Sequence, residues 1–478
     1  MGIVGGGAAG LSAAWGLERA GLRDFVVLEL EDVPGGTARS GRSAVTPYPW
    51  GAHYVPVPPP ENRPLVALLA EVGAVASWND RKEPVWAEEV LCRDPQERVF
   101  AFGSWYEGLF PRAGASREDL AALAALEVDM RGWAARRDSR GLRAFDLPRE
   151  RGSAEAAFQA LDRQSMADYA KEKGWTSPRM RWYLEYATRD DFGASLAQTS
   201  AWAGIHYYAS RIRGTASEPG EFLTWPEGNG RLVGHLGEVA GSRVRLGALV
   251  TSIEPETGTI TYLDTARSEV VSLRAEHVVC ATPRFLVPYL LGRAVPGAQE
   301  AVYGTWMVAN LHLRDRPQSP GFPLAWDNVL YESPSLGYVT ATHQRGGDFG
   351  PTVLTYYLPL IDEDVRHVRQ EALARSWEEW VRLILRDLAR PHPDLQDLLE
   401  RVDVYLWGHA MVRPRPGFLW SEALREAARP IGRVHFAHTD LSGLALFEEA
   451  QYFGLRAAEA ILSSRKAAFH SWFDASPI

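Results

Sequence analysis

The first forty residues constrain the fold of this chain more than any other stretch does. Residues 3–4 are apolar, residues 5–10 read G-G-G-A-A-G, and an apolar run over residues 25–28 ends in the acidic Glu29. This pattern predicts a strand, a glycine turn of the form G-x-G-x-x-G, a helix rich in small residues and a second strand. Elements in this order form the first unit of a Rossmann-like, doubly wound α/β sheet.

Each glycine of the turn has its own physical role. Gly5 allows the tight turn, Gly7 lets the backbone approach a pyrophosphate, and Gly10 lets the helix pack close to the strand. The free N–H groups and the positive dipole at the helix N-terminus favour the binding of phosphate. Glu29 lies nineteen residues beyond Gly10, where a carboxylate can accept hydrogen bonds from a ribose diol. The sequence therefore predicts a dinucleotide site.

A second glycine pair bears on which dinucleotide is bound. Gly35 and Gly36 follow Glu29 and are themselves followed by Arg39, and the stretch over residues 28–39 resembles the flavin-containing amine oxidase and phytoene desaturase superfamily. In that superfamily the glycine pair and the arginine lie against the pyrophosphate of FAD. NAD-binding Rossmann domains, the alternative, do not usually carry this pair. The resemblance therefore implies FAD as the cofactor.

The same resemblance continues along the chain in order. Residues 276–283 form an apolar strand that ends in Ala-Thr-Pro, and residues 432–440 form a strand that closes on Asp440, before a helix of small residues over 446–458. The resemblance implies that Asp440 touches the linkage between phosphate and ribityl. It also implies that the last helix points its N-terminus at the flavin, where a positive dipole end stabilises negative charge on the reduced ring.

The FAD contacts that the resemblance implies come from all of these segments. No cysteine lies near the closing segment to form a thioether with the flavin, so we expect FAD to be bound noncovalently. The expected FAD-binding residues are Gly5, Gly7, Ala8, Ala9, Gly10, Glu29, Leu30, Gly35, Gly36, Thr37, Arg39, Gly51, Ala52, His53, Val250, Ala281, Thr282, Asp440, Phe447, Glu448 and Ala450.

The length of the chain, 478 residues, predicts two or three domains rather than one core. The resemblance implies an α/β fold in which a Rossmann-like FAD-binding domain, assembled from three segments, carries an inserted α+β substrate domain. The expected FAD-binding segments are residues 1–64, 216–290 and 426–478. The expected substrate domain comprises a helical part over residues 65–215 and a sheet part over residues 291–425.

Local signals add several elements to this outline. Ser116 and Asp119 form an S-x-x-D capping signal that predicts the start of a helix. Recurring apolar positions predict further helices over residues 62–75, 153–173 and 178–211, and one long helix around residues 364–390. A β-hairpin is predicted across residues 254–271.

Composition limits the partners and the compartment. The formal net charge of −9 argues against nucleic acid or an anionic membrane surface as the main partner. The two cysteines, Cys92 and Cys280, provide neither a disulfide framework nor a metal cluster, so no metal is expected. No transmembrane run or signal peptide is visible. We expect a cytoplasmic protein without an integral membrane segment, or an exported one if a leader was trimmed from the abrupt N-terminus.

Three side chains are candidates for contact with the reacting groups. His53 and Tyr54 follow the segment Gly51-Ala52, which in the resembled superfamily returns to the flavin ring. They face either the ring edge and the substrate or simply pack their loop against the core. His409 follows Trp407 on a predicted strand and is a third candidate, although a lone histidine is more often a satisfied polar residue.

Several positions depart from the pattern of the superfamily. His438 and Glu449 stand where glycine is usual, and Glu449 would put a carboxylate close to the ring unless it turns to solvent. No lysine lies in the strand over residues 306–311, where many amine oxidases have one that holds a water at flavin N5. Leu446 stands where a tyrosine of the amine-caging aromatic pair is often found.

The resemblance implies an FAD-dependent oxidoreductase that transfers a hydride from a small-molecule substrate, an amine or an apolar C–H compound, to flavin N5. Oxygen or a quinone would then reoxidise the flavin. Because the lysine and the aromatic pair are missing, desaturation or isomerisation of an apolar substrate fits equally well. The second glycine pair, Gly35 and Gly36, argues against an NAD-linked dehydrogenase. A flavin-binding partner protein without turnover stays open because of His438 and Glu449.

Overall fold

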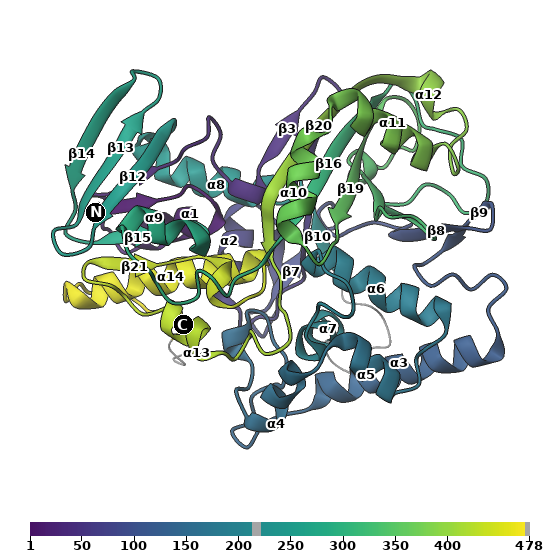
Figure 1. Cartoon of the computed structure of the whole chain (residues 1–478), viewed down its shortest axis with the longest axis horizontal. Helices are drawn as coiled ribbons and strands as arrows, with labels where there is room; N and C mark the ends of the chain where they lie inside the picture. Colours follow the sequence, from purple (N-terminus) through teal and green to yellow (C-terminus); the bar gives the residue numbers. More distant parts are fainter. Residues whose placement is uncertain (213–220, 474–478) are drawn as a thin grey trace.

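A computed structural model describes residues 1–212 and 221–473 of the chain. Figure 1 shows a lobe that carries the N-terminus, a second lobe built on a large sheet, and a helical part beside both. The predicted domain boundary between residues 215 and 216, and the last five residues, lie outside the described residues. No helix in the described ranges combines the length and apolarity that crossing a membrane requires.

The first lobe is organised around a five-stranded parallel sheet in the order β11-β2-β1-β15-β21. Its strands come from the beginning, the middle and the end of the chain, so one sheet joins three separated segments. This arrangement confirms the predicted Rossmann-like α/β fold. The strands are β1 (Gly2–Val4), β2 (Val26–Leu28), β11 (Val244–Arg245), β15 (Val278–Cys280) and β21 (Val434–Phe436).

Three helices cover this sheet, namely α1 (Ala8–Arg19), α8 (Gly230–Ala240) and α14 (Phe447–Ser464), and α1 packs against both of the others. Small residues allow α1 and α14 to approach closely. A Cβ on Gly454 would lie 2.2 Å from the backbone oxygen of Ala9, and one on Gly16 would lie 2.7 Å from Cδ2 of Leu455. The small residues at both ends of the chain are thus explained by one helix–helix contact.

Beside the parallel sheet stands a three-stranded antiparallel sheet, which contains the predicted hairpin. It consists of β12 (Ala248–Glu254), β13 (Thr259–Asp264) and β14 (Glu269–Arg274). The shorter elements are β3 (Ser40–Arg42), β4 (Pro47–Pro49), β5 (Tyr54–Pro56), α2 (Arg63–Glu71), β6 (Val75–Trp78), β7 (Pro84–Trp86), β10 (Phe222–Thr224), α9 (Val287–Leu291) and α13 (Glu422–Ala427).

The second lobe contains a seven-stranded mixed sheet in the order β20-β16-β19-β18-β17-β8-β9. The central strand β16 is buried along its whole length. The strands β8 and β9 come from the region predicted to be mainly helical, and they extend the sheet at one edge. The strands are β8 (Glu97–Ala101), β9 (Ser104–Glu107), β16 (Tyr303–Leu313), β17 (Asp327–Leu330), β18 (Gly337–Thr340), β19 (Thr352–Leu360) and β20 (Leu399–Val412).

The single long helix predicted around residues 364–390 is wrong. The structure has two helices there, α10 (Val365–Ala374) and α11 (Trp377–Leu388), followed by the short α12 (Leu395–Leu398). The break occurs at Ser376, which adopts an extended backbone and accepts a hydrogen bond from the N–H of Glu379, while the Glu379 carboxylate accepts one from Ser376. This reciprocal cap starts a new helix rather than continuing the old one.

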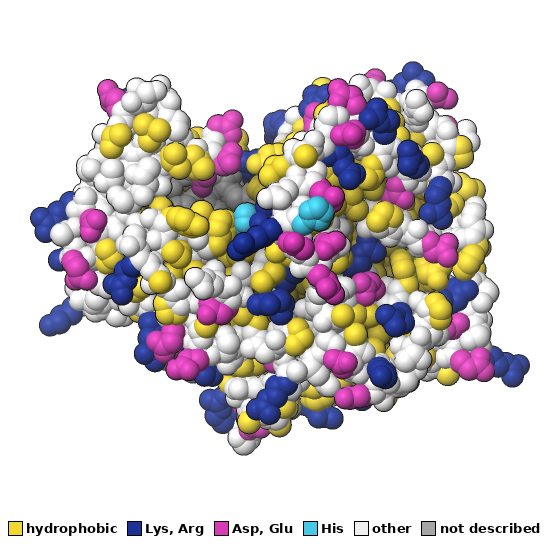
Figure 2. Space-filling model, in the orientation of Figure 1, with side chains coloured by type: hydrophobic (Ala, Val, Ile, Leu, Met, Phe, Trp, Pro, Cys, Tyr) yellow, Lys and Arg dark blue, Asp and Glu magenta, His cyan; other side chains and the backbone are white. Residues whose placement is uncertain are grey.

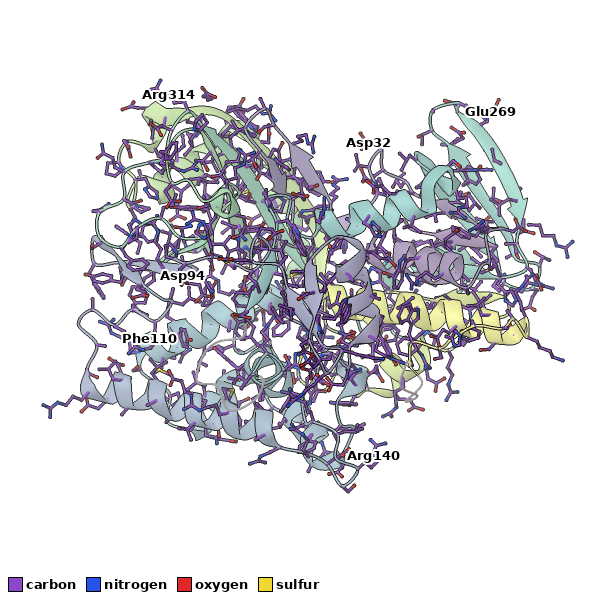
Figure 3. All side chains as sticks on the ribbon, turned by 180° about the vertical axis from the view of Figure 1, so that it is seen from behind. Asp32, Asp94, Phe110, Arg140, Glu269 and Arg314 are labelled. Atoms are coloured by element: carbon purple, nitrogen blue, oxygen red, sulfur yellow. The ribbon has the colours of Figure 1, made fainter. Side chains whose placement is uncertain are left out.

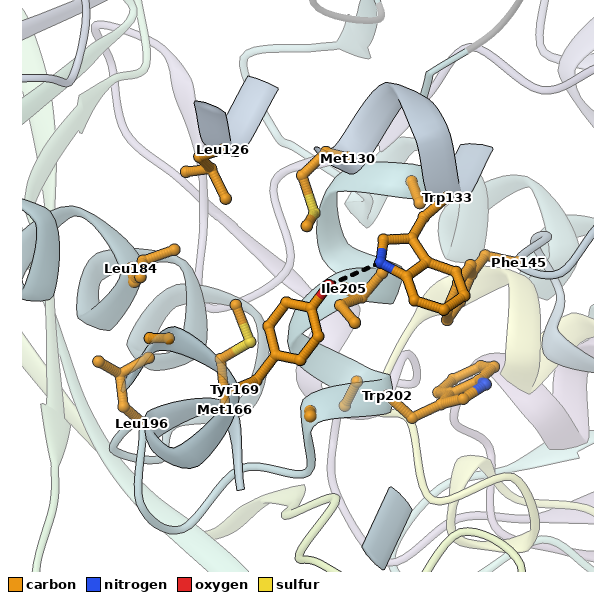
Figure 4. Packing of buried hydrophobic residues seen from close by; sticks show 14 of the residues in the cluster. Leu126, Met130, Trp133, Phe145, Met166, Tyr169, Leu184, Leu196, Trp202 and Ile205 are labelled. Atoms are coloured by element: carbon orange, nitrogen blue, oxygen red, sulfur yellow. Dashed lines mark hydrogen bonds between the residues drawn. The ribbon is translucent and has the colours of Figure 1, made fainter. Parts of the chain in front are cut away.

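The helical part consists of α3 (Arg117–Ala135), α4 (Ala156–Gln159), α5 (Met166–Glu172), α6 (Pro178–Phe192) and α7 (Ala201–Ala209). The predicted capping box of Ser116 and Asp119 is confirmed at the start of α3. Figure 4 shows the core of this part, where the indole N–H of Trp133 donates a hydrogen bond of 2.8 Å to the hydroxyl of Tyr169. Figure 3 marks the three parts from behind, with Glu269 on the first lobe, Arg314 on the second and Arg140 on the helical part.

Candidate active site

The two predicted glycine segments meet and form one backbone surface at the edge of the parallel sheet. Gly7 pairs with Gly35, and the N–H of Gly35 donates to the oxygen of Gly6 at 2.8 Å. A Cβ on Gly10 would lie 1.9 Å from a backbone oxygen of the turn, and one on Gly36 would lie 3.4 Å from Cα of Gly7. No Cβ fits at Gly10, and the positive φ of Gly35 (121°) and Gly36 (57°) favours glycine at those positions, so the two backbones form a cradle for a group such as a pyrophosphate.

Glu29 and Arg39 lie beside this cradle. The carboxylate of Glu29 accepts hydrogen bonds from the N–H groups of Gly6 at 2.6 Å and of Glu31 at 2.9 Å, which holds it at the end of β2. The guanidinium of Arg39 lies over the ring of Trp407, 5.0 Å from its centre. Because Trp407 belongs to β20, Arg39 reaches from the dinucleotide lobe to the second lobe.

The other residues expected to contact FAD lie near the same edge. Ala8 and Ala9 begin α1, Ala450 is buried in the first turn of α14, and a Cβ on Gly5 would lie 2.8 Å from the oxygen of Ala281. Thr282 follows Ala281 and is half-buried. Val250 lies on β12, a strand joined to Glu29 by the N–H of Ala248. The Leu30 side chain is 50% exposed and turns to solvent.

Asp440 presents a free acceptor inside the protein. Its Oδ2 accepts hydrogen bonds from the N–H of Arg284 at 2.7 Å and the hydroxyl of Tyr303 at 2.5 Å. Its Oδ1 is buried, lies 3.1 Å from Nδ1 of His438 and accepts no hydrogen bond from the described residues. Burial raises the pKa of Asp440, but His438 and these donors outweigh it and hold the pKa below its usual value. The free oxygen suits a hydroxyl donor on a bound cofactor.

A cavity lies beyond the cradle, between the two lobes and the helical part. The space between its walls, including the part that is open to solvent, is about 920 Å³. Figure 2 shows the surface notched between the two lobes. The cavity is lined by Thr37, Gly51, Ala52, His53, Tyr54, Pro56, Leu147, Asp190, Asp191, Arg211, Asn229, Trp306, Val308, Tyr357, Trp407, Ala410, Met411, Ala445, Leu446, Phe447 and Glu448.

Predicted flavin contacts from both ends of the sequence converge on this cavity. Thr37, Gly51 and Ala52 contribute one wall, and a Cβ on Gly51 would lie 2.2 Å from the oxygen of Thr37. Phe447 and Glu448 begin α14 at another wall, and Leu446, the residue before them, provides no side-chain cap. The first N–H groups of α14 are therefore available to an acceptor, as the resemblance implied for the flavin.

The structure brings His53 and Tyr54 to the cavity. Nδ1 of His53 lies 3.2 Å from the oxygen of Gly51, and its ring stacks on Tyr357 with 4.8 Å between ring centres. Because a carbonyl only accepts, Nδ1 carries the proton and Nε2 keeps its lone pair. Burial lowers the pKa of His53 to about 4, so the ring is neutral at pH 7. Burial raises the pKa of Tyr54 well above its ordinary value, so its hydroxyl stays protonated.

His409 does not line the cavity. Its ring stacks on Phe285 with 4.1 Å between centres and meets Tyr303 edge-on at 5.6 Å. Burial lowers its pKa to about 4, with a smaller contribution from Arg369. Of the predicted aromatic residues on β20, it is Trp407 that reaches the cavity wall.

Glu449, which was expected near the ring or in solvent, lies in neither place. It is fully buried, and its Oε1 accepts a hydrogen bond of 2.5 Å from the N–H of Arg149. Successive residues of a helix are turned by about 100°, so Glu449 faces the helical part while its neighbour Glu448 faces the cavity. Burial raises the pKa of Glu449 to about 8.

Sequence reasoning missed the carboxylates that the helical part contributes. Asp190 and Asp191, at the end of α6, line the cavity together with Glu448. Asp191 forms an ion pair of 2.7 Å with Arg211, the one guanidinium among the lining residues. Burial raises the pKa of Glu448 to about 7 and that of Asp190 well above its ordinary value. Two adjacent aspartates at a helix end look like solvent-facing charge, so the sequence carries no signal of their role.

The part of β16 over residues 306–311, which contains no lysine, faces the cavity. Trp306 and Val308 of β16 line it, and Leu446 lines it from the start of α14. Trp306 and Val308 therefore lie on the strand where a lysine was considered, and Leu446 stands where a tyrosine was considered. The walls combine apolar surface with buried carboxylates.

Taken together, the fold and the site define a two-lobed dinucleotide-binding protein with a large cavity next to the cofactor cradle. The sequence profile of the family described as flavin containing amine oxidoreductases matches residues 8–462. The chain belongs to this family, and it is an FAD-dependent oxidoreductase of the amine oxidase type. No curated protein sequence matches the chain significantly.

Solved structures support the same fold. Putrescine oxidase matches with a TM-score of 0.71 and 18% identity, over 97% of this chain and 98% of its own. Cyclohexylamine oxidase from Brevibacterium oxydans IH-35A matches with a TM-score of 0.67 and 19% identity, over 97% and 99%. A fatty acid isomerase from P. acnes matches with a TM-score of 0.65 and 15% identity, over 97% of each chain.

The described residues fit FAD. The glycine cradle suits the pyrophosphate, Glu29 lies where a ribose would be bound, and the free Oδ1 of Asp440 offers an acceptor to a hydroxyl group. Cys92 and Cys280 are buried and do not line the cavity.

Proposed function

We propose that this protein oxidises a small amine by removing a hydride from the carbon next to the nitrogen, with N5 of noncovalent FAD as the acceptor. The observation that carries the proposal is the cavity itself, whose lining brings three carboxylates and one guanidinium together with predicted flavin contacts. Bound FAD supplies the oxidising chemistry, and oxygen or a quinone takes up the electrons.

The residues of the chain contribute binding, orientation and exclusion of water. Trp306, Tyr357 and Trp407 present aromatic surface, which favours a carbon chain and attracts a cation. Asp190 accepts no hydrogen bond from a described residue and faces the cavity, so it is available to an ammonium group. A carboxylate held away from water without a partner is costly, and a bound cation relieves that cost.

The same carboxylates weigh against a purely apolar substrate. Burying an apolar chain against Asp190 and Glu448 would remove what solvation these carboxyls retain and return nothing to them. The alternative function, desaturation or isomerisation of an apolar substrate, therefore requires the carboxyl groups of Asp190 and Glu448 to stay protonated. In an amine complex, the positive charge of the bound ammonium group would offset the burial that raises the pKa of Asp190 and Glu448, and would favour their ionised forms.

Anaerobic bleaching of the flavin tests the proposal. The purified protein should be yellow and should release FAD on heat denaturation. An amine such as n-butylamine or benzylamine should bleach the bound flavin, whereas a long-chain unsaturated fatty acid should not. Admitting air, or a quinone without air, then shows which acceptor restores the colour. Bleaching by the fatty acid and by no amine would establish the apolar alternative, and a protein that no compound bleaches would favour a non-catalytic role.

The variant Asp190→Asn tests the proposed contact between Asp190 and the ammonium group of the substrate. We expect it to lower kcat/KM for amines roughly tenfold to hundredfold with unchanged flavin content, because one charge-assisted interaction is lost. Asp387→Asn is the control, since it makes the same change at a carboxylate that lies outside the cavity lining, where Asp387 accepts a hydrogen bond from the hydroxyl of Tyr356. Equal losses in both variants would show that Asp190 only supports the fold.

A further inference from the structure

A small hollow lies between the cavity and a cleft on the surface. The cavity and the hollow share four lining residues, Pro56, Leu147, Arg211 and Glu448. The hollow and the cleft share three more, Val57, Pro58 and Pro59. Exposed residues over 141–142 line the cleft, so it is open to solvent. Cavity, hollow and cleft therefore follow one another from the predicted flavin contacts to the surface.

The size and lining of the hollow suit water rather than a substrate. The space between its walls is about 240 Å³, whereas one water molecule takes up about 30 Å³ in the liquid. Pro56, Pro58 and Pro59 make part of the wall rigid, because the proline ring fixes the backbone φ. Asn62 and Ser210 are buried and add polar side chains to the lining. Buried water needs roughly two to four polar partners, and these side chains provide some of them.

Glu448 stands in the wall that the cavity and the hollow share. It is 5% exposed, and its carboxyl accepts no hydrogen bond from any other described residue. The guanidinium of Arg211 is turned elsewhere, because it donates to Oδ1 of Asp191 at 2.7 Å and to the oxygen of Tyr207 at 2.6 Å. Burial raises the pKa of Glu448 to about 7. This carboxyl group can therefore take up and release a proton near neutral pH.

The other charged groups of the cavity differ from Glu448 in charge or in position. The titratable and charged side chains that line the cavity with it are Asp190 and Asp191 from α6, Arg211 beyond α7, His53 and Tyr54 at the start of β5, and Tyr357 of β19. The histidine and the two tyrosines are uncharged at pH 7, because burial lowers the pKa of the first and raises those of the others. Arg211 lowers the pKa of Glu448 and Asp191 raises it, so their effects oppose each other. Asp190 lines the cavity but not the hollow.

We propose that Glu448 accepts the proton that the substrate ammonium group loses before hydride transfer, and that water in the hollow carries this proton to the cleft. This inference rests on the proposed amine oxidation and adds the group that prepares the substrate for it. An ammonium nitrogen has no lone pair to stabilise the carbon as the hydride leaves, so an N–H bond must break first. In this step an N–H bond breaks and an O–H bond forms on Glu448, without any change in oxidation state. The carboxyl then gives its proton to water.

The cavity favours this proton transfer in two ways. Burial lowers the pKa of an ammonium group and raises that of a carboxyl group, so the two values approach each other. Because Glu448 also borders the hollow, the proton can leave while the substrate fills the cavity.

Flavin reduction measured by rapid mixing without air tests Glu448 in the FAD-loaded full chain. With benzylamine, the second-order rate constant should rise as pH passes through about 7, because only the ionised carboxylate accepts a proton. Glu448→Gln should lower this constant roughly hundredfold near neutral pH. The loss should shrink as pH approaches the pKa of free benzylamine, since the neutral amine then binds directly. Glu449→Gln is the matched control and should keep the wild-type profile, because Glu449 is also buried with a raised pKa but faces the helical part.

Asn62→Leu tests the hollow as the exit. It removes a polar side chain that lines the hollow but not the cavity, at similar volume. We expect slower flavin reduction with a larger solvent deuterium isotope effect and an unchanged affinity for benzylamine, because the proton leaves more slowly. A wild-type rate and isotope effect in Asn62→Leu would overturn the route through the hollow.

Spectra recorded without amine separate this inference from the proposed function. Ionisation of Glu448 should shift the visible flavin spectrum around pH 7 in the wild type and in Glu449→Gln, but not in Glu448→Gln. Flavin content and melting temperature show whether each variant folds.

The possible outcomes differ for the two proposals. Bleaching by amines with an unchanged pH profile in Glu448→Gln overturns Glu448 as the proton acceptor and leaves amine oxidation intact. A spectral shift that depends on Glu448, without bleaching by any amine, supports proton exchange at Glu448 and overturns amine oxidation. Equal losses in Glu448→Gln and Glu449→Gln overturn the inference, because they show a role in folding only.

Discussion

Gly10 shows how a single residue sets the cofactor site. A Cβ at this position would lie 1.9 Å from a backbone oxygen of the turn, and backbone cannot move aside cheaply. Gly10→Ala should therefore push α1 away from β1, lower the free energy of unfolding by about 1–3 kcal/mol and abolish FAD retention. The ratio of flavin to protein absorbance and the melting temperature check both effects.

Gly132 offers a matched control for that prediction. It lies on an exposed face of α3, where a Cβ would have no described atom within 4 Å and the backbone φ is not positive. Gly132→Ala should raise stability by about 0.5–1 kcal/mol, since alanine favours a helix, and should leave flavin content unchanged. A Gly10→Ala protein that keeps its flavin would contradict the close approach of the two backbones.

At the scale of elements, the Glu449 side chain joins α14 to the helical part. Its folded-state pKa of about 8 lies above that of an exposed glutamate, so the folded protein keeps a proton that the unfolded chain loses. The stability this proton contributes is present below the unfolded pKa and is lost as pH rises toward 8. We expect the melting temperature to fall between pH 5 and pH 8.

Glu449→Gln isolates this contribution, because the amide cannot ionise and can still accept the hydrogen bond from Arg149. The variant should show a shallower fall in melting temperature over the same pH range than the wild type, and should be the more stable of the two at pH 8. Parallel pH profiles would mean that Glu449 titrates at its ordinary value. Any remaining fall reflects Glu97, Asp327 and Glu448, whose pKa values are also raised.

At the scale of the whole molecule, two of the hydrogen bonds that join the lobes come from side chains that line the cavity. The hydroxyl of Tyr357 donates to the oxygen of Gly51 at 2.9 Å, and the indole N–H of Trp407 donates to the oxygen of Trp50 at 2.6 Å. Both donors belong to the large sheet, and both acceptors belong to the segment that returns to the cavity. FAD should therefore stabilise the assembled lobes as well as its own domain.

Tyr357→Phe tests this coupling. Loss of one hydrogen bond should cost about 1 kcal/mol and weaken FAD binding roughly fivefold, with a smaller rise in melting temperature when FAD is added to the apoprotein. Titration of the apoprotein with FAD measures the affinity. An unchanged affinity would show that the segment around Gly51 is held by its own lobe alone.

Features that depend only on residues close together in the sequence were predicted best. The glycine turn, Glu29 and the cap at Ser116 follow from backbone sterics and short-range hydrogen bonds, and the structure places them as expected. The break at Ser376 was missed although its capping signal is local, because apolar periodicity on both sides of it favoured one continuous helix. Residues 65–215 were assigned to the helical part of the substrate domain, and no local signal indicates that β8 and β9 join the large sheet, because the partner of β8, β17, lies far away in the sequence.

The sequence by itself determined the FAD fold and the glycine cradle, since a glycine where no Cβ fits and an acid at the end of a strand act within one βαβ unit. Only the tertiary structure decided the cavity. It brought Asp190 from α6 to the same cavity as the predicted flavin contacts of α14, set Asp327 beside Glu97 and turned Glu449 away from that cavity. The physical reason is that burial and charge pairing depend on which distant segments come into contact, and no local sequence pattern indicates which segments those are.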